Sequence, residues 1–307
     1  MAISLLLAAG CNRPEAEDPV IPEKPKGKYE LKELTATLPE ADTKTDMDLA
    51  TMVVKWSTGD RIVVIGSDGA PHQYVLESGA GTPIGRFVYV NSTSVATYDD
   101  PSQLTAIYPA CAVASANSST ATIRINSDRS SDYGNYGITS WNNDSRFAFP
   151  NNDIKVAKPS TGTETSQGLN FKFTQLGTWC RFLFDFTQSP DFDADYSIGE
   201  TMRGMTITTI GGDLISGTAT LNLSDLSLSS GNETSVNWDF SSPSQLDAQR
   251  VKGVMMFPSV KTNSILHVTL RTDRYAFEFY GSPNMDFSAG SVLKFPITVD
   301  KCVFLRY

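Results

Sequence analysis

Apolar and polar residues alternate in short runs along most of this chain of 307 residues. Clear runs occupy residues 61–65, 73–76, 86–90 and 121–125, and the pattern resumes at residue 169 and continues to the C-terminal end. Gly, Asp, Ser or Pro residues separate the runs, as they do at turns between strands. No long stretch repeats its apolar residues with the helical period of about 3.6 positions. The pattern predicts an all-β fold of antiparallel β-sandwiches.

Two segments interrupt the alternation. Residues 127–159 are rich in Asn, Asp, Ser and Gly and carry scattered aromatic residues, which is typical of a long irregular loop. Residues 158–167 consist mainly of Ser, Thr, Gly and charged residues, a composition typical of a connection between domains. At usual domain lengths the chain holds about two domains. We expect one sandwich at residues 29–160 and a second at residues 161–307.

The N-terminal end carries a targeting pattern. Residues 1–10 form a short apolar run that ends in small residues and precedes Cys11. This order predicts a bacterial lipoprotein signal peptide, after which the Cys11 thiol carries lipid and becomes the new N-terminus. Residues 11–28 are rich in Pro and Glu and predict an extended linker. Because no later segment reaches the roughly 20 apolar residues of a membrane span, lipid on Cys11 is the membrane anchor that we expect.

Charge and cysteine usage narrow the class of protein. The formal net charge is −9 and basic residues do not cluster, so nucleic acid is not an expected partner. Cys111, Cys180 and Cys302 have no Cys-x-x-Cys spacing and lie in strand-like sequence. They fit either small buried apolar side chains or one disulfide with one odd thiol.

Candidate catalytic and metal-binding residues are sparse. Asp191, Asp193 and Asp195 alternate, but a solvated acidic loop explains them more simply than a calcium site does. Of the two histidines, His267 alternates with its neighbours as an ordinary strand residue would, and neither lies in a nucleophile or base motif. No Gly-rich phosphate loop is followed by a helix and Lys. We therefore expect no enzyme activity, no cofactor and no metal site.

The last segment alternates with unusual regularity up to the final residue. Its apolar face is formed by Phe295, Ile297, Val299, Val303, Leu305 and Tyr307. A terminal strand with such a face must be covered. Either it completes its own sheet or it docks on a neighbouring molecule.

Several motifs, taken in order, resemble those of the fimbrillin-like proteins of Bacteroidetes, the subunits of type V pili. The first is the segment Trp56-Ser-Thr-Gly59-Asp60-Arg-Ile, in which a tight Gly-Asp turn leads into a buried strand and Trp56 covers the core. The others are Tyr108-Pro109 and residues 171–176, 212–221, 256–258 and 287–295. Together they extend from Trp56 nearly to the end of the chain.

The resemblance implies a fold, a location and a role. It implies two transthyretin-like β-sandwiches in tandem, on a lipoprotein exported to the outer membrane. Glu15, Glu17 and Asp18, which follow Cys11, resemble surface-export signals of such bacteria. The implied role is a structural or adhesion subunit of a cell-surface pilus, as stalk or anchor. Its implied partners are other pilus subunits, of the same or another kind, and a host protein or glycan.

The family's mode of assembly also maps onto this chain. In polymerising subunits a protease removes the first strand, and the C-terminal strand of another subunit fills the groove. Here the removable strand corresponds to residues 29–38, with apolar Tyr29, Leu31, Leu34, Ala36 and Leu38, and the donor strand corresponds to residues 295–307.

Processing in the best-known members of the family follows an Arg, and here no Arg lies between Arg13 and Arg61. Lys44 is the nearest candidate. Either a protease of different specificity acts at Lys44, or the subunit is not trimmed, which suits an anchor.

An outer-membrane glycan-binding lipoprotein is the alternative function. Trp141 lies beside Asn142 and Asn143, so that an aromatic ring for stacking on a sugar is next to amide hydrogen-bonding groups. The same aromatic loop would also serve to attach residues 127–159 to their own sandwich, which we favour.

Overall fold

The computed structural model describes residues 28–39, 55–90, 94–125, 154–160, 168–185, 201–245, 249–257, 264–281, 287–290, 292–298 and 303–306. Within these ranges the chain forms β-strands and two short 3-10 helices, η1 (Pro101–Gln103) and η2 (Ala110–Ala112). The all-β expectation is confirmed. No helix in the part of the chain described here is long and apolar enough to cross a membrane.

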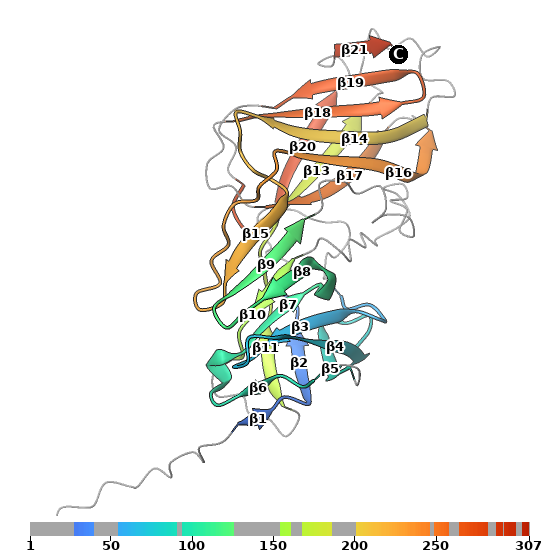
Figure 1. The fold of residues 1–307 in the computed structure, drawn as a ribbon. Coiled ribbons are helices and arrows are strands. Elements are labelled where there is room, and N and C mark those ends of the chain that lie inside the picture. The colour runs from blue at the N-terminus through green and yellow to red at the C-terminus, as the bar shows by residue number, and fades with distance from the viewer. Residues whose placement is uncertain are drawn as a thin grey trace, which may run out of the picture.

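The first half of the molecule is built on an eight-stranded sheet, seen in the lower part of Figure 1. Neighbouring strands in it are antiparallel except β11 and β2, which run parallel. A separate pair, β1 (Tyr29–Glu30) and β6 (Thr97–Tyr98), lies beside it. The order in the large sheet is β11 (Leu169–Lys172), β2 (Glu33–Thr37), β5 (Ile84–Tyr89), β4 (Pro71–Ser78), β3 (Arg61–Ile65), β7 (Thr105–Tyr108), β10 (Lys155–Ala157) and β12 (Thr174–Gln175).

Both faces of this sheet are covered near its centre, as β3 shows. Ile62 and Val64 belong to one apolar cluster, whereas Val63 and Ile65 belong to a second cluster on the other face. A strand buried on both faces reads as a continuous apolar run, which explains the sequence Ile-Val-Val-Ile. The second cluster includes side chains of a three-stranded sheet in the order β15 (Gly217–Asn222), β9 (Thr120–Ile125) and β8 (Val113–Ala116).

The second half is a sandwich of two further sheets, seen in the upper part of Figure 1. Its core lies between them, where Phe182 and Phe295 from one sheet join Met205, Val268 and Phe277 from the other. One sheet has the order β16 (Ser235–Gln245), β14 (Thr201–Ile210), β18 (Ile265–Thr272), β19 (Tyr275–Tyr280) and β21 (Val303–Arg306). The other has the order β17 (Gln249–Met256), β13 (Thr178–Asp185) and β20 (Val292–Thr298).

Strand pairing crosses the domain boundary that we predict at residues 160 and 161. β11 and β12 follow this boundary in sequence but belong to the eight-stranded sheet of the first half. β15 follows it as well, and pairs with β9 from Gly217↔Ile125 to Asn222↔Thr120. The two halves therefore share strands, and the boundary itself and the transthyretin-like character of each half stay predictions.

One segment predicted as loop contains a buried strand. Residues 155–157 form β10, which pairs with β7 and β12, and all three of its residues are buried. They include Lys155, only 1% exposed, whose Nζ lies 5.5 Å from the centre of the Tyr108 ring. The prediction of an irregular loop up to residue 159 is wrong here, because a short strand flanked by Asn, Asp and Pro shows too few alternations to be recognised.

Candidate strand-exchange interface

The segment predicted as removable, residues 29–38, forms two strands. β1 covers its first two residues, and β2 begins after a break at Leu31 and Lys32. β2 pairs with β5 from Glu33↔Val88 to Thr37↔Ile84, and in parallel with β11 from Leu169↔Leu34 to Lys172↔Thr37. Both edges of β2 are therefore hydrogen-bonded, so that this early strand lies inside the sheet (Figure 1).

One face of β2 is buried and the other is partly open. Leu34, Ala36 and Leu38 are 0%, 0% and 3% exposed, whereas the alternating Glu33, Thr35 and Thr37 are intermediate. This alternation fixes the register of the strand, because a slip by one residue would turn the leucines to solvent. Of the other apolar positions predicted for the segment, Leu31 is buried at 3%, but Tyr29 is 37% exposed and contacts Tyr98.

The buried face of β2 packs beneath Trp56. Its Nε1 donates a hydrogen bond to the carbonyl oxygen of Ala36 at 3.1 Å, and the indole is 1% exposed. Phe87, Tyr108 and Phe173 meet its ring edge to face, with ring centres 4.8, 5.3 and 5.7 Å away. Edge-to-face arrangements at such distances are favourable aromatic contacts.

Two small residues leave room for this indole. Ala36 lies opposite Gly85 in the register of β2 and β5. A Cβ atom at position 85 would lie 2.6 Å from Cδ1 of Leu76 and 2.8 Å from Cδ1 of Trp56, closer than carbon atoms tolerate. The glycine is required here by close packing.

The Gly-Asp turn that follows Trp56 has the predicted form. Gly59 has a φ of +89°, in the left-handed region that favours glycine. The Asp60 carboxylate accepts a hydrogen bond from the amide of Ser57 at 2.7 Å and another from the Tyr108 hydroxyl at 3.2 Å. The turn therefore links Trp56 to β3 on one side and to β7 on the other.

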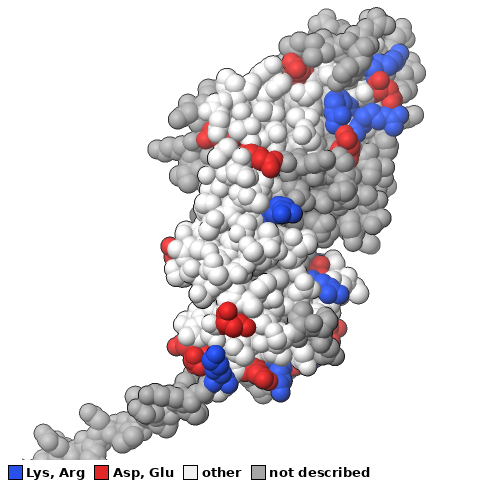
Figure 2. Space-filling view, in the orientation of Figure 1, with Lys and Arg blue, Asp and Glu red and all other residues white. Residues whose placement is uncertain are grey.

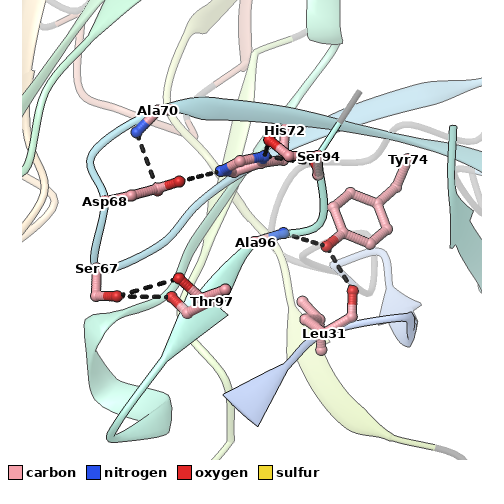
Figure 3. Close-up of polar contacts among 9 residues, drawn as sticks. All are labelled: Leu31, Ser67, Asp68, Ala70, His72, Tyr74, Ser94, Ala96 and Thr97. Carbon is pink, nitrogen blue, oxygen red and sulfur yellow. Dashed lines mark hydrogen bonds and ion pairs between the residues drawn. The ribbon is translucent and has the colours of Figure 1, made fainter. Parts of the chain in front are cut away.

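A polar cluster holds the backbone of Leu31, just before β2 (Figure 3). The buried Tyr74 hydroxyl donates to the carbonyl oxygen of Leu31 at 2.6 Å and accepts from the amide of Ala96 at 3.2 Å. The amide of Leu31 in turn donates to the carbonyl oxygen of Ala96 at 2.9 Å. Burial raises the pKa of the Tyr74 hydroxyl far above its ordinary value, so the hydroxyl keeps the proton that it donates.

His72 lies in the same cluster, with its side chain 2% exposed. Its Nε2 is 2.8 Å from a carboxylate oxygen of Asp68, and its Nδ1 is 2.6 Å from the carbonyl oxygen of Ser94 and 3.2 Å from the Ser94 hydroxyl. An Asp, a His and a Ser thus lie in line, as in a hydrolase triad. The nearest partner of Nδ1 is a backbone carbonyl, however, which suits a structural link better than a base that activates Ser94.

Several charged groups on the described surface form ion pairs. Arg86 forms ion pairs with Glu33 and Glu77 beside the partly open face of β2. Figure 2 shows that acidic and basic side chains are scattered over a mostly uncharged surface, with a mixed group on the second half of the molecule. That half contains the pairs Arg203–Asp273 and Arg271–Asp239.

The predicted donor segment, residues 295–307, is divided between two sheets. Phe295 is 7% exposed and stacks on Phe182 with ring centres 4.9 Å apart, and Ile297 is 2% exposed in the same core. Val303 and Leu305 lie in β21, which forms one end of the five-stranded sheet and pairs with β19 from Tyr275↔Arg306 to Glu278↔Val303. Val299 and Tyr307 lie outside the described residues.

Several other predicted site residues also lie outside the described ranges. These are the lipidation site Cys11, the processing site Lys44, Cys302 and the proposed glycan contacts Trp141, Asn142 and Asn143. Cys111 is exposed, whereas Cys180 is a buried free thiol whose pKa is raised by burial. His267 lies in β18, as expected of a strand residue, and its ring stacks on Tyr280 at 4.5 Å.

Sequence reasoning missed the cluster of Asp68, His72 and Ser94. Their spacing fits no motif, and Ser94 lies near His72 only because the chain folds back between them. The one available indication is that His72 shares the alternate positions of β4 with Tyr74 and Leu76, and all three are buried. A histidine on the buried face of a strand needs hydrogen-bond partners.

Comparisons with known proteins agree with this architecture. A family model described as "Fimbrillin-like" matches residues 50–305. A search of the curated proteins finds no match. Among solved structures, a proposed cell adhesion protein from Bacteroides ovatus is 15% identical with a TM-score of 0.55, and the match covers 91% of this chain and 96% of that one. A second, from Bacteroides uniformis, is 16% identical with a TM-score of 0.50, and the match covers 90% and 96%. At these identities the structures support the fold, and the family model, which matches most of the chain, shows that the protein belongs to the fimbrillin-like family.

Proposed function

We propose that this protein is a structural subunit of a cell-surface pilus, as stalk or anchor, and that it assembles by exchange of β-strands. The observation that carries the proposal is the position of β2. This strand fills an apolar groove between β5 and β11, and it joins the rest of the chain through residues 40–54. A cut in residues 40–54 would leave β2 held by non-covalent contacts alone. Membership of the fimbrillin-like family supports the role of pilus subunit.

Loss of β2 would open a site suited to another strand. The facing edges of β5 and β11 would lose their backbone partner, and the space now filled by Leu34, Ala36 and Leu38 would be empty. Strand addition restores both kinds of contact, because backbone hydrogen bonds give affinity and alternate side chains set the register. The incoming strand must therefore present apolar side chains at every second position.

The C-terminal segment has the alternation that this groove requires, and β21 is the part of it that lies at one end of a sheet. Removal of Phe295 and Ile297 would open the core of the second half, whereas β21 pairs with β19 at one end of its sheet. We therefore narrow the donor to residues 299–307, with Val299, Val303, Leu305 and Tyr307 as the side chains that enter the groove.

The positions of the two strands suit a head-to-tail polymer. β2, which fills the acceptor site, lies in one half of the molecule, and β21 lies at the far end of the other half (Figure 1). When the donor and the acceptor lie on different surfaces, each added subunit leaves a new acceptor site, and open fibres result.

Processing and anchoring complete the proposal. Cleavage at Lys44 by a protease specific for lysine would release the first strand, and lipid on Cys11 would hold an untrimmed copy to the outer membrane with its domains facing outward. We propose two transthyretin-like sandwiches with the boundary near residue 160. Other subunits of the same or another kind are the partners, and a host protein or glycan is the target of the finished fibre.

Controlled cleavage tests the exchange. Insertion of a site-specific protease sequence after Lys44 should give protein that forms ladders of polymers on gels only after it is cut. Deletion of residues 303–307 should abolish the ladder, whereas Arg306→Ser, on the other face of the alternation, should retain it. An unchanged ladder after the deletion would contradict strand donation. N-terminal sequencing of cell-surface material distinguishes the roles, because a start at Cys11 indicates an anchor or precursor and a start near Thr45 indicates a polymerising subunit.

A further inference from the structure

We propose that Asp68, His72 and Ser94 form a proton-dependent latch that holds the N-terminal end of the first strand, residues 29–38, in its groove. The latch is closed when the His72 ring carries two protons and loosens when it carries one. The inference concerns control of the strand-exchange site and rests on the proposed function for its biological meaning. Its physical content can be tested without polymer formation.

The two nearest hydrogen-bond partners of His72 suit a ring that donates from both nitrogens. Nδ1 lies 2.6 Å from a carbonyl oxygen and Nε2 lies 2.8 Å from a carboxylate oxygen. A carbonyl oxygen can only accept a hydrogen bond, and a carboxylate likewise offers acceptors alone. A neutral imidazole has one N–H and can satisfy only one of them, whereas the imidazolium satisfies both.

Loss of one proton changes the contact with residue 94. If Nε2 keeps its hydrogen for Asp68, the Nδ1 lone pair faces the Ser94 carbonyl oxygen at 2.6 Å, and an attraction becomes a repulsion. The Ser94 hydroxyl, 3.2 Å from the same nitrogen, can then donate to it. The neutral ring therefore favours a different position of residue 94, with the hydroxyl nearer and the carbonyl farther away.

Residues 94–96 transmit this shift to the first strand (Figure 3). Ala96, two residues beyond Ser94, accepts a hydrogen bond from the amide of Leu31 and donates one to the Tyr74 hydroxyl, which itself donates to the carbonyl of Leu31. Both backbone groups of Leu31 thus depend on where residues 94–96 lie. Displacement of Ser94 weakens the contacts that fix the start of the strand and leaves those of Leu34 and Ala36 in place.

The other titratable groups around the latch do not account for a change near neutral pH. Tyr74 keeps its proton because burial, with a smaller contribution from Asp68, raises its pKa. Arg61 on β3 is exposed and bonds Gln73, away from the ring. Among the described residues, the titratable side chains on the same and neighbouring elements are Asp68, Arg61, Tyr74, Glu77, Arg86, Tyr89 and Tyr98, of which Glu77 and Arg86 form an ion pair with each other. Histidine is the side chain type that ordinarily changes charge between pH 5 and 8, and the chain has two of them.

Hydrogen exchange on the intact protein tests the latch. Protection factors, corrected for intrinsic exchange, are measured by mass spectrometry for peptides that contain residues 28–36 and 94–98 at pH 5.5 and pH 8.0. We expect the protection factors of both peptides to be about tenfold greater at pH 5.5 than at pH 8.0, because loss of one hydrogen bond changes an equilibrium by about this factor. His72→Gln should remove the difference, and Asp68→Asn, which keeps the shape of the exposed turn, should reduce it. His267→Gln is the matched control and should leave it unchanged.

The outcomes separate the latch from the proposed function. Equal protection of the wild-type protein at the two pH values would overturn the latch, as would a pH difference that survives His72→Gln or disappears in His267→Gln. In protein cut after Lys44, release of the N-terminal fragment should be several-fold faster at pH 8.0 in the wild type and independent of pH in His72→Gln. If protection depends on pH through His72 but the cut protein never forms polymers, strand exchange is refuted and the latch is supported.

Discussion

Replacement of Leu34 by Ala measures how firmly the buried face of β2 holds the first strand. Leu34 is fully buried, and β5 and β11 fix the backbone on both sides of it, so that the cavity left by the side chain cannot readily collapse. We expect the free energy of unfolding to fall by about 3 kcal/mol, roughly a hundredfold in the unfolding equilibrium constant.

The measurement is urea unfolding followed by tryptophan fluorescence. The m-value, the slope of the unfolding free energy against urea concentration, should be unchanged if only stability is altered. Thr35→Ala is the matched control, because this neighbour lies on the partly open face of the same strand. Its effect should stay below about 1 kcal/mol. Equal losses in the two variants would refute the view that the strand is held mainly by its buried apolar face.

Three further substitutions or reactions test other parts of the structure. Trp56→Phe removes the donor to the Ala36 carbonyl and should cost about 1–3 kcal/mol in thermal melts, and an unchanged melting temperature would contradict this. Arg86→Ala breaks ion pairs that are partly exposed, so its cost should be below about 1 kcal/mol. The cost should vanish in 1 M salt, where strong screening limits charge interactions to about 3 Å, and a loss insensitive to salt would argue for packing instead. Burial raises the pKa of Cys180, so its thiol should stay unlabelled by maleimide at pH 8 until urea unfolds the protein, as peptide mapping would show. Because its folded pKa is raised, the stability from this thiol is present below the ordinary pKa of about 9 and falls as pH rises above it.

The role of the polar cluster around His72 and Tyr74 could not be predicted from the sequence, because it depends on contacts with backbone groups elsewhere in the chain. In the sequence His72 only precedes the alternating run at residues 73–76, and its role depends on a carbonyl oxygen contributed by Ser94, 22 positions away. Backbone carbonyls are present at every residue, so the sequence carries no mark of the one that meets the ring. Tyr74 is a similar case, because its hydroxyl bridges two backbone groups that come from separate segments.

For several strands, such as β2 and β3, the sequence alone determined that the segment is a strand and which of its residues are buried. The alternation of Leu34, Ala36 and Leu38, the continuous apolar run of β3 and the turn after Trp56 are all readable, because side chains alternate across a strand and glycine permits a left-handed turn. Only the tertiary structure decided which strands become neighbours. The parallel pairing of β2 with β11, the pairing of β15 with β9 and the inclusion of β10 in the large sheet join residues far apart in the chain through backbone groups that every residue has. Partner choice in a sheet therefore follows from how the whole chain folds back on itself, and local alternation does not encode it.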